Sequence, residues 1–383
     1  MIDMPITDIQ LNTIEEAIED IKAGKVIIVV DDEDRENEGD FVCAAECVTP
    51  EIINFMATHG RGLICTPITE ERAEELELAP MVRKNTDLHG TAFTISIDYL
   101  LRGCTTGISA YDRSTGIKAL TEEGTKGSDY ARPGHIFPLV ARKGGVLRRT
   151  GHTEASIDLA SLAGLYPAAV LVEILNPDGT MARLPQLAEI AAKFDLKLIT
   201  IKDLVAYRME RERLVKRSME MEIETPLGKF DLIAFTEMNE NITHLALKTG
   251  SWKPGEPVLT RVQAATNANE LLALILGGGE SNIGKCLKRI KEEENGLLLL
   301  LRYPEQPMDL LQSLEILKEQ QEKGEKLDAY LNRPKNAIQK DLGIGAQILH
   351  DLGVRKLRLL TNRPRKRIGL IGYGLEVVDE VSM

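Results

Sequence analysis

An acidic segment that follows an apolar run is the part of this sequence best suited to chemistry. Residues 31–40 contain seven carboxylates and come directly after the apolar residues 26–30. A β-branched run of that length indicates a buried strand, so the acids emerge at its carboxyl end, where α/β proteins tend to form ligand sites. Like charges this dense repel one another unless solvent, a cation or protonation relieves them. A hard divalent cation such as Mg²⁺ suits these oxygens.

The plain alternative for this segment is a solvated acidic loop. Arg35, Asn37 and Gly39 interrupt the acids, however, and such interruptions favour a folded turn in which each side chain has its own place. We therefore treat the segment as a candidate metal site.

A second group of candidate residues surrounds His152. This histidine follows Arg148 and Arg149 and precedes residues 156–163, a run of small residues that we expect to be helical, with Thr153 as its cap. Free amides at a helix start beside two arginines would hold a phosphate. The alternative for Thr153 is a simple cap with no ligand.

His135 and Glu173 could move protons. His135 lies in a loop that Pro133 and Pro138 stiffen and that can turn sharply at Gly134. Glu173 stands within an apolar strand, where desolvation favours the protonated acid and makes it a candidate for proton transfer. The alternatives are a structural histidine, and an acid paired with a structural arginine.

Composition limits the function classes. A chain of 383 residues suggests two domains, and its net charge of -12 argues against a general nucleic-acid binder. It has no apolar run long enough for a membrane span and no secretory signal. Its five cysteines predict reduced thiols in the cytoplasm, or in an organelle stroma if a transit peptide was removed. We interpret Cys43 and Cys47 as core residues, because no second pair completes a zinc site.

The order of segments predicts an α/β protein of the α+β type. In the first half we expect strands at residues 63–66, 93–98, 168–175 and 196–201, and helices at 52–59 and 184–194. A charged connecting helix follows at residues 209–217. In the second half we expect strands at 221–223, 230–235 and 244–247, and helices at 283–294 and 308–324. The predicted domains are 1–208 and 221–383, joined by a linker at 209–220.

Together these residues supply a metal site, an anion site, a histidine and an acid. That set fits metal-assisted enolisation of a sugar phosphate, in which a cation polarises a carbonyl while neighbouring groups move protons. The residues alone do not name the substrate, and a different Mg²⁺-dependent sugar-phosphate isomerase or lyase stays open.

The first half, residues 10–208, resembles 3,4-dihydroxy-2-butanone 4-phosphate synthase, an enzyme of riboflavin biosynthesis. Four motifs carry the resemblance, at residues 31–40, 105–113, 132–138 and 151–155. It implies conversion of D-ribulose 5-phosphate to formate and 3,4-dihydroxy-2-butanone 4-phosphate with Mg²⁺ or Mn²⁺, in two ions per site. It also implies a homodimer with sites at the interface, so that His135 acts on the partner subunit's substrate.

The resemblance implies a role for each matching residue. Glu36 and His152 would bind metal, and His135 and Glu173 would be the essential acid–base residues. The substrate would be held by residues of three segments: Arg35, Glu36, Asp40, Arg149, Thr150, Gly151, His152, Thr153 and Glu173.

The second half resembles GTP cyclohydrolase II. The resemblance rests on residues 222–228, 261–262, 343–349, 359–366 and 372–377. That family binds zinc through three cysteines, and Thr266, Gly277 and Gly279 stand at those positions here. Without zinc there is no activated water.

Other catalytic positions of that family also differ here. Residues 302–307 replace its arginine-rich loop, and Ile338 and Lys340 stand where its general base and a nearby arginine belong. We expect no zinc and no GTP hydrolysis. Thr361 and Lys366 match nucleotide contacts, so the alternative is a regulatory or scaffolding module with weak nucleotide binding.

Overall fold

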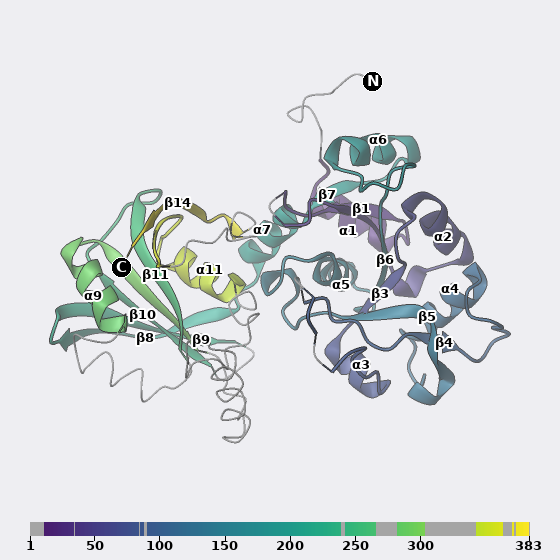
Figure 1. The fold of residues 1–383 in the computed structure, drawn as a ribbon, viewed down its shortest axis with the longest axis horizontal. Helices are drawn as coiled ribbons and strands as arrows, with labels where there is room; N and C mark the ends of the chain where they lie inside the picture. The colour runs from purple at the N-terminus through teal and green to yellow at the C-terminus, as the bar shows by residue number, and fades with distance from the viewer. Residues whose placement is uncertain are drawn as a thin grey trace, which may run out of the picture. The chain divides into compact units, whose positions relative to one another are not determined.

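The computed structural model describes residues 11–33, 35–83, 85–87, 90–238, 242–265, 282–302, 342–362, 370 and 373–382. The chain divides into two compact units, 1–211 with 371–373, and 212–370 with 374–383 (Figure 1). The division falls just beyond the predicted end of the first domain at residue 208.

The first unit is built on a mixed seven-stranded sheet. The strand order is β4 (Ile97–Tyr99), β5 (Tyr130–Val140), β3 (Cys65–Ile68), β6 (Ala169–Glu173), β2 (Gly39–Ala44), β1 (Ile27–Val30) and β7 (Leu198–Thr200). Strand β3 runs parallel to β5 and β1 runs parallel to β7, whereas the other neighbours are antiparallel.

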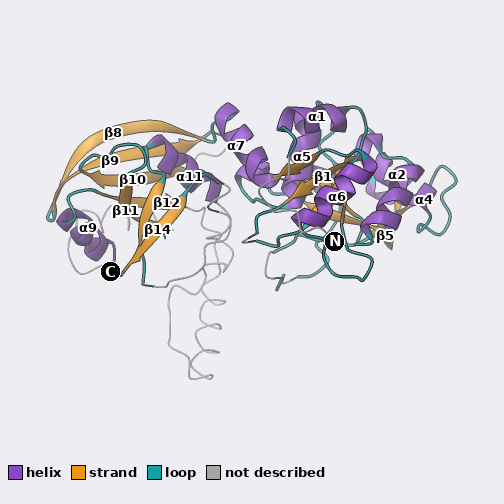
Figure 2. Ribbon diagram, turned by 90° about the horizontal axis from the view of Figure 1, so that it is seen from above, coloured by secondary structure: helices purple, strands orange, loops and turns teal. Residues whose placement is uncertain are grey.

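Helices cover both faces of this sheet, as Figure 2 shows from above. Their bounds are α1 (Ile14–Lys22), α2 (Pro50–Phe55), α3 (Glu70–Glu75), α4 (Ala110–Ala119), α5 (His152–Leu162), α6 (Leu184–Phe194) and α7 (Ile201–Arg211). Helix α5 lies against β2 and β6 and contacts α1 and α7. None of the described helices is long and apolar enough to cross a membrane.

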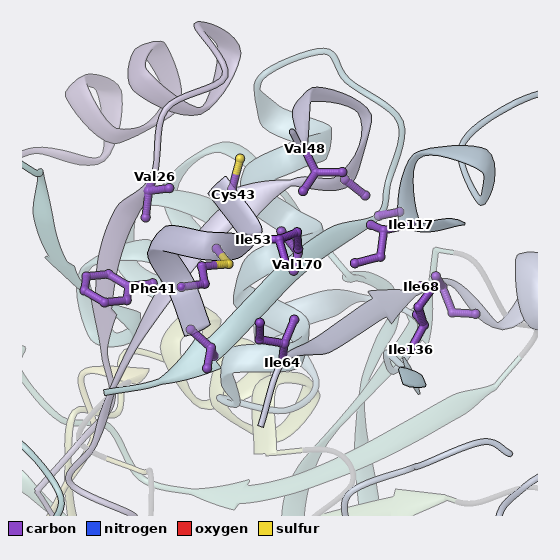
Figure 3. Packing of buried hydrophobic residues seen from close by; sticks show 14 of the residues in the cluster. Val26, Phe41, Cys43, Val48, Ile53, Ile64, Ile68, Ile117, Ile136 and Val170 are labelled. Carbon is purple, nitrogen blue, oxygen red and sulfur yellow. The ribbon is translucent and has the colours of Figure 1, made fainter. Parts of the chain in front are cut away.

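The core buries both faces of β1, the strand from which the acidic segment starts. In β1, Ile28 and Val30 belong to one apolar cluster, and the alternate residues Ile27 and Val29 are fully buried as well, so both faces are covered. Figure 3 shows the cluster, in which Ile53 of α2 packs beside Val170 of β6. The acidic segment therefore starts from a strand fixed on both sides.

The second unit is also a mixed seven-stranded sheet. Its order is β14 (Glu376–Val381), β13 (Lys356–Leu360), β11 (Pro257–Ala265), β12 (Gly296–Arg302), β10 (Thr243–Thr249), β9 (Gly228–Glu237) and β8 (Val215–Thr225). Helix α9 (Asn282–Glu292) packs on it through Ile283, Leu287 and Ile290, and α11 (Leu342–Asp351) contacts β8. Two mixed α/β units confirm the predicted fold class.

Some predicted elements differ from the structure. The connecting helix 209–217 is wrong, because α7 ends at Arg211 and β8 begins at Val215. Strand β8 lies at the sheet edge with most side chains exposed, so its charged sequence carries no apolar alternation to reveal it. The predicted helix 52–59 is α2 followed by a π-helical turn at Met56–Gly60. The predicted helix 308–324 lies outside the described residues.

Candidate active site

Asp31 organises the acidic turn after β1. Its buried carboxylate accepts the backbone amides of Glu36 at 3.2 Å and Glu38 at 2.8 Å. It also accepts the Arg35 guanidinium at 2.8 Å. Three hydrogen bonds to one carboxylate hold the segment in a folded turn. The alternative of a solvated acidic loop does not hold. Asp31 was not among the residues predicted individually for the site.

Arg35 joins two of the acids. One of its terminal nitrogens contacts Asp31 at 2.8 Å and Glu36 at 2.6 Å. Although burial opposes the guanidinium charge, the Glu36 and Asp31 carboxylates raise the pKa of Arg35. Arg183, at the start of α6, donates to the carbonyls of Glu36 and Asn37 and so ties the turn to that helix.

Asp31, Glu36 and His152 each place one possible ligand atom within 4.8 Å of the others. The His152 Nε2 lies 3.1 Å from the carbonyl oxygen of Val29, and since a carbonyl only accepts, Nε2 carries the proton. This leaves the Nδ1 lone pair facing Glu36 Oε2 at 4.0 Å. Burial lowers the pKa of His152, which favours the neutral ring that a metal requires.

Asp40 is the most crowded acid of the group. It is buried on β2 directly opposite Glu173 on β6, and 4.0 Å separate its Oδ1 from His152 Nε2. Within the described residues this Oδ1 has no hydrogen-bond partner. Burial raises the pKa of Asp40 well above its ordinary value, and the Glu173 and Glu36 charges raise it further.

These observations fit a bound divalent cation. Two ligands on a magnesium ion with bonds of about 2.1 Å lie up to about 4.2 Å apart, so 4.0 Å between His152 Nδ1 and Glu36 Oε2 is a workable span. The unpartnered Asp40 oxygen and the crowded carboxylates would both gain from positive charge. Mostly oxygen donors suit Mg²⁺ or Mn²⁺.

Glu173 is the acid at the end of β6. Its Oε2 accepts the backbone amide of Leu63 at 2.9 Å, so among the described residues this carboxylate oxygen is held by an amide and not by an arginine. A Cβ added to Gly62 would lie 2.5 Å from the same oxygen, so this loop approaches Glu173 as closely as glycine permits. The structure therefore brings Glu173, Asp40, Glu36 and His152 together at one end of the sheet.

The start of α5 carries His152 and therefore lies beside Glu36 and Asp40. The helix begins at His152 with Gly151 as its N-cap, so the prediction that Thr153 caps a helix at 156–163 is wrong. Thr153 lies inside the first turn, because Gly151 has the extended backbone of an N-cap and the helix begins at the next residue. The amides of this turn and the adjoining Thr150 lie where the sequence predicts an anion-binding site, which stays a prediction.

Arg149 lies next to the start of α5. Its guanidinium contacts Glu154 of the first turn at 2.6 Å, and Glu154 also accepts the amide of Arg142 at 3.0 Å. The buried Glu154 thus fixes where Arg149 points.

His135 is separated from this cluster within the chain. It lies on β5, and β3 stands between β5 and β6. Its side chain is 45% exposed, and its Nδ1 is 2.8 Å from Asp98 Oδ2. Asp98 ends a predicted strand and was not identified as a site residue.

The second unit is described only in part at its predicted site. Arg261 on β11 donates to the carbonyl of Leu360 at 2.9 Å, and Thr361 is buried just after β13. Cys286 is buried in the core, and burial raises the pKa of its thiol. Thr266, Gly277, Gly279, Ile338, Lys340 and Lys366 lie outside the described residues.

Comparison with known proteins supports both resemblances. The sequence model of the 3,4-dihydroxy-2-butanone 4-phosphate synthase family matches residues 15–207, and that of GTP cyclohydrolase II matches residues 216–382. Riboflavin biosynthesis protein RibBA of Cytophaga hutchinsonii is 52% identical over 375 residues, covering 98% of this chain and 93% of that protein. RibBA of Parabacteroides distasonis is 51% identical over 378 residues, covering 99% and 93%.

Solved structures agree with the sequence comparison. RibBX, a two-domain 3,4-dihydroxy-2-butanone 4-phosphate synthase from A. baumannii, superposes with a TM-score of 0.64 at 40% identity, covering 97% of this chain and 99% of that chain. A 3,4-dihydroxy-2-butanone 4-phosphate synthase in complex with two magnesium ions gives a TM-score of 0.50 at 41% identity, covering 52% and 98%.

Proposed function

This chain belongs to the family of riboflavin biosynthesis proteins that join a 3,4-dihydroxy-2-butanone 4-phosphate synthase domain to a GTP cyclohydrolase II domain, and from this we propose the reaction of its first unit. That unit converts D-ribulose 5-phosphate to 3,4-dihydroxy-2-butanone 4-phosphate and formate. The five carbons of the ketose become four plus one, and no oxidant or reductant is consumed. The observation that carries the proposal is the convergence of Glu36, His152, Asp40 and Glu173 at one sheet end.

Glu36 and His152 hold the metal, with Asp31 positioned to assist. Two ions per site, Mg²⁺ or Mn²⁺, would supply Lewis-acid stabilisation of enediolate charge. Arg35 and Asp40 contact the sugar oxygens. The match to a synthase crystallised with two magnesium ions supports this choice of ion.

The substrate phosphate is held at the start of α5. Arg149, Thr150, Gly151 and Thr153 surround that helix end together with His152, and unsatisfied helix amides attract anions. An anchored phosphate keeps a short substrate in place through successive proton transfers.

Glu173 and His135 carry out the proton transfers, and we propose that they come from different subunits of a homodimer. Glu173 lies beside Asp40, whereas His135 is exposed on a strand two positions away in the sheet. A partner subunit would bring its own imidazole to the cluster. Exposed apolar residues just after β4 and around the start of α4, namely Leu100, Ile108 and Tyr111, would suit an interface on this part of the unit.

An assay of the purified full-length protein tests this function. Formate release from ribulose 5-phosphate should require Mg²⁺ or Mn²⁺. His135→Gln and Glu173→Gln should still bind ribulose 5-phosphate but lose about a hundredfold or more in turnover. Absence of formate with either ion would overturn the proposal, and so would a variant with weaker binding but a normal maximal rate.

The second unit, in this proposal, does not hydrolyse GTP. Thr266, Gly277 and Gly279 provide no zinc ligand at the family's three cysteine positions. The alternative, a regulatory or scaffolding module that binds nucleotide weakly, rests on Thr361 and Lys366, which match nucleotide contacts of that family. Thr361 is buried just after β13, next to Leu360, whose carbonyl accepts from Arg261 of β11. Localisation in the cytoplasm stays a prediction.

A further inference from the structure

A buried ion pair that no proposed step of the reaction uses joins helices α5 and α7. Asp158 Oδ2 of α5 lies 2.6 Å from a terminal guanidinium nitrogen of Arg208 in α7, and the two side chains are only 9% and 10% exposed. Taking two charges out of water is costly unless the geometry is good and further hydrogen bonds complete both groups. Both residues make such hydrogen bonds to one loop, residues 144–147.

The loop at residues 144–147 is hydrogen-bonded to both members of the pair. Asp158 Oδ2 accepts the backbone amide of Val146 at 2.7 Å. The same nitrogen of Arg208 that contacts Asp158 also donates to the carbonyl oxygen of Gly144 at 2.9 Å. The pair therefore holds one donor and one acceptor of the loop, and both hydrogen bonds are assisted by a charge.

Glycine at position 145 lets the loop come this close to Asp158. A Cβ added to Gly145 would overlap the second carboxylate oxygen of Asp158, Oδ1. Gly145 also has φ +61, a backbone conformation that residues with a side chain rarely adopt. The distance between the loop and α5 is thus as short as the backbone permits.

The loop leads directly to the arginines before α5. The amides of Arg148 and Arg149 both donate to the carbonyl of Gly145, at 2.9 and 3.1 Å. Gly151, the N-cap of α5, donates its amide to the carbonyl of Arg149 at 2.8 Å. A continuous series of backbone hydrogen bonds therefore runs from the loop that Asp158 holds to the start of α5.

We propose that Asp158 and Arg208 are positioning residues for the substrate phosphate, and that they act on Arg149 through the loop at residues 144–147. The inference rests on the proposed phosphate site at the start of α5. Glu154 directs the Arg149 side chain, whereas the ion pair fixes the backbone that carries it. Removal of either charge would leave the other buried without it, so the loop would have to rearrange.

Variants of the pair should weaken substrate binding more than they slow turnover. In Arg208→Gln and Asp158→Asn, KM for ribulose 5-phosphate should rise by about tenfold or more, the scale of one misaligned hydrogen bond to a charged group, and kcat should change less. Inorganic phosphate, used as a competitive inhibitor, should weaken by a similar factor. Mg²⁺ affinity measured by titration calorimetry should stay unchanged. Arg208→Lys keeps the charge and should restore part of the lost affinity.

Gly145→Ala tests the same contact with both charges in place. The new methyl group would overlap Asp158 Oδ1, so the loop must move and KM should rise as in Arg208→Gln. Gly164→Ala is the matched control. Gly164 follows the end of α5 with φ +76, and its added Cβ would have nothing within 4 Å. This variant carries similar backbone strain without the contact and should leave KM unchanged.

Arg211→Gln is the control for charge, since Arg211 lies on α7 but pairs with Glu15 at the surface. It should bind ribulose 5-phosphate as the wild type does. Wild-type KM in Arg208→Gln, Asp158→Asn and Gly145→Ala would overturn the positioning role and leave the proposed function standing. An equal loss of Mg²⁺ and phosphate affinity would also overturn it, because the whole site would then be disturbed. Wild-type KM in Arg149→Gln would instead remove the proposed phosphate site, and the positioning role with it.

Discussion

Asp40 and Glu173 face each other directly across antiparallel strands β2 and β6, and Asp40 is buried. Like charges opposite one another in a sheet destabilise it. The same contact raises the pKa of Asp40, together with burial. Opposed acids therefore lie where the predicted site residues converge, and such destabilising arrangements are common at functional sites.

Asp40→Asn should stabilise the metal-free protein and abolish activity. Removing one of two opposed charges should add about 0.2–1 kcal/mol to the free energy of unfolding at neutral pH. Urea unfolding in the presence of a chelator measures this. Glu33→Gln, an exposed change in the same acidic turn, is the control and should have no effect. A less stable Asp40→Asn protein would contradict the repulsion argument.

Glu36→Gln and His152→Gln should lose Mg²⁺ binding and turnover while the protein stays folded. Both residues place ligand atoms in the same small volume, and His152 Nε2 is already engaged with Val29. Titration calorimetry with Mg²⁺ and formate release give the two readouts, and circular dichroism checks the fold. Glu33→Gln again serves as control. Near-normal turnover in either variant would show that the ligand assignment is wrong.

The sequence predicts which residue types form the candidate site better than it predicts how the fold brings them together. The sequence, mainly through its resemblance to the synthase family, singles out Glu36, Asp40, His152 and Glu173, and the structure places these four side chains at one end of the sheet, whereas their roles stay predictions. Their arrangement depends on strand pairing over long separations, such as Asp40 opposite Glu173. Local patterns do not contain such pairing.

Residues that act through backbone contacts left no local signal. Asp31 looks like one acid among several, and only the folded turn shows that it accepts two amides and Arg35. Asp98 needs β4 and β5 to pair before it meets His135. The prediction of a helix at 209–217 failed for a related reason, because the pairing of β8 with β9 outweighs local propensity.

Mixing two inactive variants should restore activity if His135 serves the partner subunit. His135→Gln and Glu173→Gln each remove one residue of a shared site. A dimer with one chain of each has one site with both residues intact and one with neither. Random exchange makes half of the dimers mixed, so about a quarter of wild-type activity should return. Subunits are exchanged by mild denaturation and refolding, and each variant mixed with itself is the control. No recovery in verified mixed dimers would place His135 and Glu173 of one site in the same chain.

The second unit should bind no stoichiometric zinc and release no formate from GTP. Thr266, Gly277 and Gly279 offer one hydroxyl and no side-chain nitrogen or sulfur, whereas catalytic zinc needs three protein ligands. The full-length protein is assayed with GTP alone and added Zn²⁺, because ribulose 5-phosphate would itself yield formate. Metal content is measured by mass spectrometry. Titration calorimetry with GTP then distinguishes the two remaining roles. Binding heat that is lost in Thr361→Val supports a nucleotide-binding module. No binding heat in the wild-type protein supports a purely structural unit. Zinc-dependent consumption of GTP would refute the loss of hydrolysis outright.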